Sequence, residues 1–395
     1  MSRERYISFN NKLNGFSFAK LGLFTGFADG IYNAVYSLVV LEIFHSSIAV
    51  GIYATLYSMF CFCVGLFVNE ILRLFPKARI FYFAMLMVAI CYAMMSFSIL
   101  PRTFVILDYT TGIATTLITV LIPLFMSDFS KNIGMARLNA RYHLWMNIGA
   151  VFAPTVAVLI ANAHGDRAAF FGSAIIYLLG WSFFKLFRIV QQDKEVKNIN
   201  PRKTIKSLII NTKLFFRVQG MMRAYLVNFG YYALRTLRVL YVPILVIENG
   251  FSKDTLGLVL TLGIIPYLVL TEFMGRAVKK YGKTIWLVLG IGSFSVLSAM
   301  ATVVTGIPLL AIFVVWQISG ALMESVHDLL FFDNVTRQQQ ARFYGVFRTS
   351  VNLPYIIMPG VGALMIALCG ATSAVWAVSA FVGAFSILVL VAGRR

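Results

Sequence analysis

The sequence predicts an all-α membrane protein, with twelve transmembrane helices in two pseudo-symmetric six-helix bundles. The 395-residue chain is 59% hydrophobic and only 12% charged, whereas about a quarter of the residues in a soluble domain are charged. Apolar runs of membrane-spanning length recur along the chain, and short segments of its first half recur in its second. Because hydrocarbon offers no hydrogen-bond partners, each crossing is expected to satisfy its own backbone as a helix.

Twelve apolar runs are close to the roughly 20 residues that cross a bilayer. In chain order, we expect helices at 19–43, 48–72, 79–99, 103–128, 137–162, 168–190, 220–247, 254–275, 284–306, 308–333, 341–368 and 371–392. The first run has no small-residue cleavage pattern and is interpreted as a retained span rather than a signal peptide.

The distribution of Lys and Arg predicts the orientation. They fall mainly in the N-terminal arm, in alternate loops and at the chain end. An excess of Lys and Arg marks cytoplasmic loops, so both termini are expected to be cytoplasmic. Short loops and the lack of an organellar address predict a bacterial cytoplasmic membrane, where we expect a monomer surrounded by lipid.

The net charge of +19 does not indicate nucleic-acid binding. The positive charge is spread over many short loops, as the orientation requires, so no nucleic-acid partner is expected. The four Cys residues lie inside apolar runs, and no spacing with His is typical of a metal site. We therefore expect neither a metal nor a cofactor.

An internal repeat relates the two halves of the chain. Several residues recur 205 positions later: Ala136, Arg137, Asn147 and Pro154 match Ala341, Arg342, Asn352 and Pro359, and Phe24, Ala28 and Tyr36 match Phe229, Ala233 and Tyr241. With one further residue of offset, Gly51, Thr55 and Leu56 match Gly257, Thr261 and Leu262. Secondary transporters are often built from such duplicated halves.

The repeat predicts a domain at 1–190 and another at 220–395. The basic segment 191–219 lies between them. Its apolar residues Ile205, Leu208, Ile209 and Phe216 fall roughly on one helical face, which is typical of an interfacial helix. A disordered basic linker is the alternative interpretation.

Twelve spans, a duplication of six helices and a long basic central segment resemble the major facilitator superfamily over essentially the whole chain. The family's loop signature is a Gly, an acid four residues later, a second Gly and basic residues. In GRAVKKYGKT, Gly275 and Gly282 are present, and Lys279 stands where the acid is usual. The first-half version retains Gly65, with Asn69 in place of the acid. The resemblance implies gating roles for Gly275, Lys279 and Gly282, without the acid that normally latches one conformation.

The resemblance also implies a secondary transporter that moves a small molecule by alternating access. The acids inside the spans, described below, indicate the proton as coupling ion. Members of this length often export, so export is the expected direction. One alternative is a receptor or assembly subunit without transport, which the loss of the signature acid favours. Another is a lipid-modifying membrane enzyme, but the chain has no Asp-rich diphosphate motif and no Ser/His nucleophile pair. We therefore do not expect an enzyme.

Ionisable residues inside the spans are the most informative feature, because such groups are costly in hydrocarbon and persist mainly where function or pairing compensates. The third, sixth, ninth and twelfth helices carry none in their interiors. The first, fourth, seventh and tenth carry Asp29, Asp108, Arg235, Arg238, Glu324, His327 and Asp328. In the family, the former group forms outer scaffold and the latter lines the central cavity.

Asp29 lies in the middle of GFADGIYNAVY, between glycines that allow another backbone to approach. It is interpreted as a proton acceptor or substrate contact. The alternative is a buried ion pair with Arg235, whose place in the repeat is one residue from that of Asp29. The proton-acceptor and ion-pair interpretations are compatible, because an ion pair that breaks on protonation can couple proton binding to transport.

Arg235 and Arg238 are three residues apart and share one helical face. Two guanidinium groups there could bind an anionic substrate. They could equally neutralise Asp29 and a second acid.

Glu324, His327 and Asp328 occupy positions i, i+3 and i+4 of the tenth helix. Adjacent carboxyls and a His are the composition of a proton relay. The alternative is a polar network that braces the neighbouring helix, through Arg348.

The remaining candidates are gates and cavity-lining residues. Asp108 lies close to the outer end of its helix, where it is a gating candidate or simply interfacial, and His143, Glu272 and Arg348 are expected in gate ion pairs. Substrate contacts are expected from Asn33, Tyr32, Tyr36, Tyr231, Tyr232 and Tyr355. Packing is the alternative role for each tyrosine.

Overall fold

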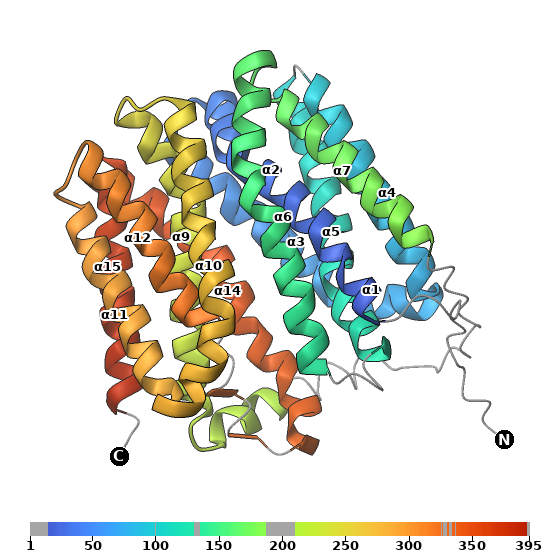
Figure 1. Cartoon of the computed structure of the whole chain (residues 1–395), viewed down its shortest axis with the longest axis vertical. Coiled ribbons are helices and arrows are strands. Elements are labelled where there is room, and N and C mark those ends of the chain that lie inside the picture. The colour runs from blue at the N-terminus through green and yellow to red at the C-terminus, as the bar shows by residue number, and fades with distance from the viewer. Residues whose placement is uncertain are drawn as a thin grey trace. The chain divides into compact units, whose positions relative to one another are not determined.

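A computed structural model of the chain describes residues 15–98, 100–129, 135–186, 210–324, 326, 330–331, 334–335 and 337–392, although some side chains within these ranges are excluded. The described residues form helices joined by short turns (Figure 1). In order, the helices are α1 (Gly15–Ala19), α2 (Leu21–Phe44), α3 (Ser47–Leu74), α4 (Lys77–Phe97), α5 (Pro101–Phe129), α6 (Met135–His164), α7 (Ala168–Lys185), α9 (Met221–Glu248), α10 (Lys253–Tyr281), α11 (Lys283–Ala301), α12 (Ile307–Glu324), α14 (Arg337–Cys369), the short 3₁₀ helix η2 (Thr372–Ala374) and α15 (Val375–Ala392).

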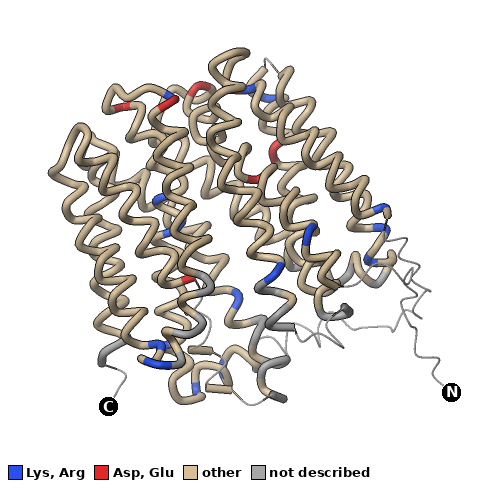
Figure 2. Tube along the Cα trace, viewed as in Figure 1, with Lys and Arg blue, Asp and Glu red and all other residues tan. Residues whose placement is uncertain are grey.

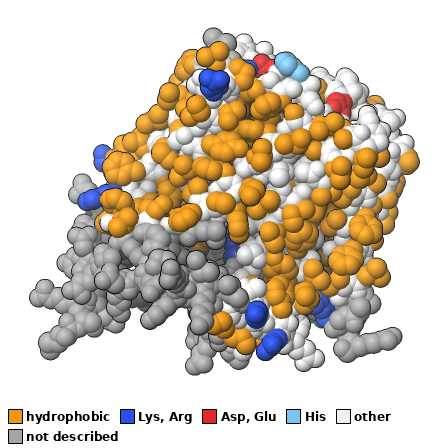
Figure 3. Space-filling view, turned by 180° about the vertical axis from the view of Figure 1, so that it is seen from behind, with side chains coloured by type: hydrophobic (Ala, Val, Ile, Leu, Met, Phe, Trp, Pro, Cys, Tyr) orange, Lys and Arg blue, Asp and Glu red, His pale blue; other side chains and the backbone are white. Residues whose placement is uncertain are grey.

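Twelve stretches of helix among the described residues are long and apolar enough to cross a membrane. This confirms the predicted fold class. Many large apolar side chains point outward, and hydrophobic side chains cover much of the described surface in Figure 3. Such a surface is stable in lipid and would aggregate in water. Charged residues lie mostly near the helix ends, with only a few along the helices between them (Figure 2).

Several predicted helix boundaries were wrong. The helix expected at 284–306 ends at Ala301, because the chain turns through Thr302 and reaches Gly306 with a positive φ of 69°. The helix expected to continue to residue 190 ends at Lys185 within the described part of the chain. The helix expected from residue 341 begins at Arg337.

Contacts group the chain into two units. Unit 1 comprises Met1–Val39, Met59–Lys197 and Lys253–Thr261, and unit 2 comprises Val40–Ser58, Asn198–Ser252 and Leu262–Arg395. The grouping departs from the expected domains 1–190 and 220–395 at two places. The first part of α3 groups with second-half helices, and the first part of α10 groups with first-half helices. The domain boundaries expected from the sequence stay a prediction.

In unit 1, glycines bring α2 and α6 into close contact. A Cβ atom at Gly26 would overlap the backbone of Met146, and one at Gly149 would overlap the carbonyl oxygen of Leu23. A Cβ atom at Gly30 would lie 2.5 Å from the Cβ of Ala153. The expectation that the glycines beside Asp29 admit a second backbone is therefore confirmed, and small residues at this spacing are typical of membrane helix pairs.

Two further helix crossings contain the repeated residues. In unit 2, a Cβ atom at Gly51 of α3 would lie 2.6 Å from the carbonyl oxygen of Pro359 in α14. In unit 1, a Cβ atom at Gly257 of α10 would lie 3.5 Å from the carbonyl oxygen of Pro154 in α6. Glycine thus packs on a proline turn in both crossings. The matches of Gly51 with Gly257 and of Pro154 with Pro359 therefore have a physical cause, because these residues make the two contacts.

Beyond these matched pairs, a hydroxyl group lies one turn along each crossing. In unit 1 the hydroxyls of Thr155 and Thr261 are 2.8 Å apart. In unit 2 the repeat-related Thr55 faces Gly360. The two crossings therefore share one threonine, while Thr155 of the first is replaced by Gly360 in the second.

The part of segment 191–219 that the structure describes is helical at 210–217. Phe215 is fully buried, with its ring 6.1 Å from Tyr225 and 6.0 Å from Phe343. Phe216, which the sequence analysis placed on the apolar face, is 37% exposed. This short helix therefore packs on unit 2 through Phe215. The expected interfacial residues before 210 lie outside the described residues.

Candidate functional site

Asp29 of unit 1 lies on α2, at the glycine crossing with α6. It accepts a hydrogen bond of 2.6 Å from the hydroxyl of Tyr177 on α7. No Lys or Arg side chain pairs with Asp29 among the residues that the structure describes. Its carboxylate therefore has a neutral donor as partner. The alternative ion pair with Arg235 would join the two units, and it stays a prediction.

Asp108 on α5 is fully buried, and its gating or interfacial role stays a prediction. The hydroxyl of Tyr32 donates to its Oδ1 at 2.8 Å, and the hydroxyl of Tyr36 donates to its Oδ2 at 3.1 Å. Both tyrosines lie on α2 and were expected to contact substrate. Burial is the physical reason for the arrangement, because a carboxylate removed from water requires hydrogen-bond donors.

Aromatic rings connect the two acidic sites of unit 1. The ring of Tyr177 meets that of Tyr92 edge to face at 5.7 Å between centroids, and Tyr92 stacks on Tyr32 at 4.8 Å. Tyr177 donates to Asp29, and Tyr32 donates to Asp108. A chain of packed rings therefore joins the two carboxylates. We call these residues, Asp29, Tyr177, Tyr92, Tyr32, Tyr36 and Asp108, the acid cluster.

Unit 2 has a corresponding cluster of arginines and tyrosines. Arg238 on α9 is only 9% exposed and donates a hydrogen bond of 3.2 Å from Nη1 to the hydroxyl of Tyr267 on α10. Gly320 of α12 permits this contact, since a Cβ atom there would lie 3.1 Å from Nη1 of Arg238. Arg238 is therefore packed into the bundle, with a protein partner.

Arg235, one turn earlier on α9, has a different environment. It is partly exposed, and no hydrogen bond or ion pair joins its guanidinium to another described residue. Its electrostatic neighbours are Tyr355, Tyr231, Tyr232 and Glu324. These come from α9, α12 and α14, so three helices converge on one cationic group. We call Arg235, Arg238 and these four neighbours, together with Tyr267, the arginine cluster.

The other predicted site residues are of three kinds: those with described side chains, a glycine at a turn, and those whose side chains the structure does not describe. Asn33 is exposed on α2, His143 is half-buried on α6 beside the ring of Tyr142, and Arg348 is half-buried on α14. Gly282 begins α11 with a positive φ of 79°, which explains a glycine at this turn. Lys279, Glu272 and Gly275 belong to α10, but their side-chain surroundings lie outside the described part. His327 and Asp328 also lie outside the described residues, so the relay with Glu324 stays a prediction.

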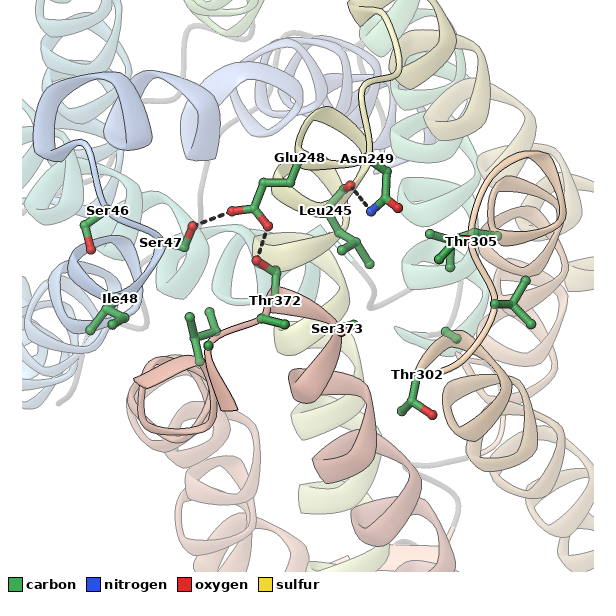
Figure 4. Close-up of a pocket in the computed structure, with 16 residues that line it drawn as sticks. Ser46, Ser47, Ile48, Leu245, Glu248, Asn249, Thr302, Thr305, Thr372 and Ser373 are labelled. Atoms are coloured by element: carbon green, nitrogen blue, oxygen red, sulfur yellow. Dashed lines mark hydrogen bonds between the residues drawn. The ribbon is translucent and has the colours of Figure 1, made fainter. Parts of the chain in front are cut away.

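A separate pocket of about 490 Å³ lies in unit 2, at the end where α9 and α14 finish and α3 begins. Figure 4 shows Glu248 between two hydroxyl groups. Ser47 donates to one carboxylate oxygen at 2.7 Å, and Thr372 donates to the other. Glu248 thereby ties the start of α3 to η2. Sequence reasoning missed this residue because it follows an apolar run and appears there as an ordinary loop acid.

Sequence reasoning also missed Tyr177, Tyr92 and Tyr267. The sequence analysis selected charged residues inside the spans. Tyr92 and Tyr177 lie on helices without such residues, and Tyr267 lies on a helix that contributed no charge to the predicted cavity. A usable signal was available, since a buried Tyr hydroxyl requires a partner and an acid in the same bundle can supply one. Among the described residues, no group of three His, Cys, Asp or Glu side chains could hold a metal ion.

Comparisons with known proteins agree with this architecture. The sequence profile of the Major Facilitator Superfamily matches residues 20–252 and 224–395. No curated protein matches the sequence.

Three solved structures have a similar fold. A mutant of the nucleoside transporter NupG is 12% identical, with a TM-score of 0.72 and coverage of 97% of this chain and 100% of that one. A D-xylose–proton symporter is 15% identical, with a TM-score of 0.75 and 96% of each chain covered. A POT family transporter in complex with a thioalcohol-conjugated peptide is 10% identical, with a TM-score of 0.75 and 94% of each chain covered. At these identities, the likeness shows the fold.

Proposed function

Since the chain belongs to the Major Facilitator Superfamily, we propose that it is a proton-coupled secondary transporter that exports a small molecule by alternating access. The family makes the chain an integral membrane transporter rather than an enzyme, and this confirms the resemblance stated from its sequence. Proton coupling, direction and the residues involved are our proposal.

The observation that carries the proposal is the environment of Asp29. Its carboxyl group is held by the hydroxyl of Tyr177, and no described basic side chain pairs with it. A carboxyl group surrounded by low-dielectric material gains from binding a proton unless a cation compensates it. Asp29 therefore supplies a site whose charge changes during the cycle, and the adjacent α2–α6 crossing is where that change would act on the packing.

In the same proposal Asp108, a gating candidate from the sequence, is a second proton site. Both oxygens already accept tyrosine hydroxyls, so protonation would release one of these bonds. His143, Glu272, Gly275, Lys279, Gly282 and Arg348 remain gate candidates, and Glu324, His327 and Asp328 remain candidates for a relay. The orientation with both termini in the cytoplasm of a bacterial cell, and the monomeric state, remain expectations from the sequence.

The proposal is tested by proton movement in liposomes that contain the purified full chain and a pH-sensitive dye. Individual solutes from a metabolite and drug panel are added, and we expect at least one to change the internal pH only when the protein is present. Asp29→Asn should abolish that signal, while exchange of the labelled solute across the membrane continues. Loss of proton movement with retained exchange would separate coupling from binding.

The matched control is Glu42→Gln on the same helix, because Glu42 is an exposed acid. It should leave proton movement unchanged. If Asp29→Asn still accumulates solute against its gradient when a pH gradient is imposed, coupling through Asp29 is wrong. Binding of a solute with no movement in any variant would instead favour a receptor. Right-side-out and inside-out vesicles then separate export from import.

A further inference from the structure

We infer that the substrate is an organic monoanion, such as a carboxylate on an aromatic or apolar body, and that Arg235 binds it while Arg238 has a structural role. The inference rests on the proposed transport function and assigns the substrate class of the same molecule. It resolves the two interpretations of the arginine pair that the sequence left open, because the two side chains have different environments.

The first step is the difference in hydrogen bonding. Arg238 is buried and donates to Tyr267, so its guanidinium belongs to the packing of α9 against α10. Arg235 makes no hydrogen bond or ion pair with the described residues, although it has five N–H donors. A partly enclosed guanidinium without acceptors is unfavourable. The described residues leave these donors open to a further acceptor, and an oxyanion satisfies a guanidinium best.

The second step is the charge balance. The described ionisable groups of the arginine cluster are Arg235, Arg238 and Glu324, with two positive charges and one negative charge. Among these described groups, one positive charge is left over. A bound monoanion would neutralise the cluster, whereas a cation would increase its charge and a neutral solute would leave it unbalanced. Charge complementarity in a low-dielectric site favours the monoanion.

The third step is the shape of the group and its surroundings. A planar guanidinium donates two parallel hydrogen bonds to a carboxylate. Tyr231 and Tyr232 pack edge to face at 5.0 Å between centroids, and Tyr355 lies 6.3 Å from Tyr232. These rings border Arg235 on two helices, α9 and α14. Aromatic faces beside a fork-shaped donor fit a carboxylate that is attached to an apolar or aromatic body.

The test measures binding to the purified full chain by thermal shift and isothermal titration calorimetry. The probes are benzoate, phenylacetate and benzenesulfonate, each with its neutral amide, together with benzylammonium and inorganic phosphate. We expect the aromatic anions to raise the Tm and the matched amides to have no effect. Arg235→Gln should weaken anion binding by about 10- to 100-fold, as expected for loss of hydrogen bonds to a charged group, and Arg235→Lys should weaken it less.

Arg223→Gln is the matched control, because it removes the same charge from the same helix outside the arginine cluster. It should bind the probes as the unsubstituted chain does. Equal binding of acids and amides, tighter binding of benzylammonium, no binding of any aromatic anion, or unchanged anion binding in Arg235→Gln would each overturn the inference. Phosphate binding without the aromatic anions would also overturn it, since the rings would then have no part.

Benzenesulfonate separates this inference from the transport proposal, because it does not cross lipid as a neutral acid. If it binds through Arg235 but neither it nor any solute of the panel drives proton movement in liposomes, the anion site stands and proton coupling fails. If a neutral or cationic solute drives proton movement that depends on Asp29, coupling stands and the anion site fails.

Discussion

The acid cluster of unit 1 and the arginine cluster of unit 2 use the same neutral partner for opposite charges. Tyr177, Tyr32 and Tyr36 donate their hydroxyls to carboxylates, whereas Tyr267 accepts from a guanidinium. A tyrosine hydroxyl can do either, because it is both donor and acceptor. The two clusters therefore both use tyrosine hydroxyls, although Asp29 and Arg235, one residue apart in the repeat, have opposite charges.

The difference lies in how completely each charge is satisfied. Asp108 has a donor on each oxygen, and Asp29 has one donor. In unit 2, Arg238 has a partner and Arg235 has none among the described residues. Each cluster thus pairs a well-satisfied charge with a poorly satisfied one. The well-satisfied member should matter more for stability, and the other should matter more for function.

The largest effect is expected when the sign of the acid cluster is reversed. Asp108→Lys would bury an ammonium group beside two hydroxyls that were oriented toward an anion. An uncompensated buried charge costs about 3–5 kcal/mol, so we expect little folded protein by fluorescence-detected size-exclusion chromatography. Asp108→Asn keeps the shape and should fold. Normal yield and Tm for Asp108→Lys would show that water reaches the site. The distinction between a well-satisfied and a poorly satisfied acid in this cluster would then be wrong.

The two arginines should then separate in stability. Arg238→Met removes the donor to Tyr267 from a buried position, and we expect a loss of about 1–3 kcal/mol in unfolding by SDS titration. Arg235→Met should lose less than about 0.5 kcal/mol, as is usual for side chains without specific partners. Equal losses, or a larger loss at Arg235, would contradict the assignment of structural and binding roles.

Removing single hydroxyls from the acid cluster should have a moderate effect. Tyr177→Phe and Tyr32→Phe each delete one hydrogen bond to a carboxylate, so we expect a loss of about 1–2 kcal/mol for each. The aromatic contacts remain, because the ring is kept. Combining Tyr177→Phe with Asp29→Asn in a double-mutant cycle should give a coupling energy, whereas combining it with Glu42→Gln should give none. Additive losses in both pairs would show that the Tyr177 bond does not contribute.

The smallest effect is expected at Glu248, a carboxylate with two hydroxyl donors at the helix ends rather than inside a bundle. Ser47→Ala should lower the free energy of unfolding by about 0.5 kcal/mol, since water can replace the lost donor at an exposed site. Thr372→Val, which removes a buried hydroxyl, should cost somewhat more. If Ser47→Ala lowers the free energy of unfolding as much as Tyr177→Phe does, burial does not determine how much these hydrogen bonds contribute to stability.

Much of the fold could be predicted from the sequence, because span length and backbone satisfaction in hydrocarbon leave few alternatives. The glycines beside Asp29 and the repeat were also recognisable, since both depend on residue size and spacing. The end of α11 was missed because TVVTG at 302–306 is apolar enough to continue a helix, and only Gly306 marks the turn.

The site was harder to predict because a lipid-exposed helix is apolar on all sides, so the sequence gives the depth of a residue but not the direction that it faces. The sequence shows Asp108 near one end of an apolar run, but its hydrogen-bond donors are two tyrosines of α2 that are more than 70 positions away. The partners of Arg238 and Asp29 are likewise on other helices. Which residues become hydrogen-bond partners depends on the tertiary structure, and a hydropathy pattern does not contain that information.

The paired crossings, Gly51 on the Pro359 turn and Gly257 on the Pro154 turn, have a consequence for the origin of the chain. In each, a helix start from one half meets a helix from the other half. Before the gene was duplicated, a six-helix ancestor would have made both as one contact between two identical subunits, the self-complementary interface of a twofold dimer. In a chain formed by fusion of two such copies, each copy can diverge, so that one carries acids and the other carries arginines.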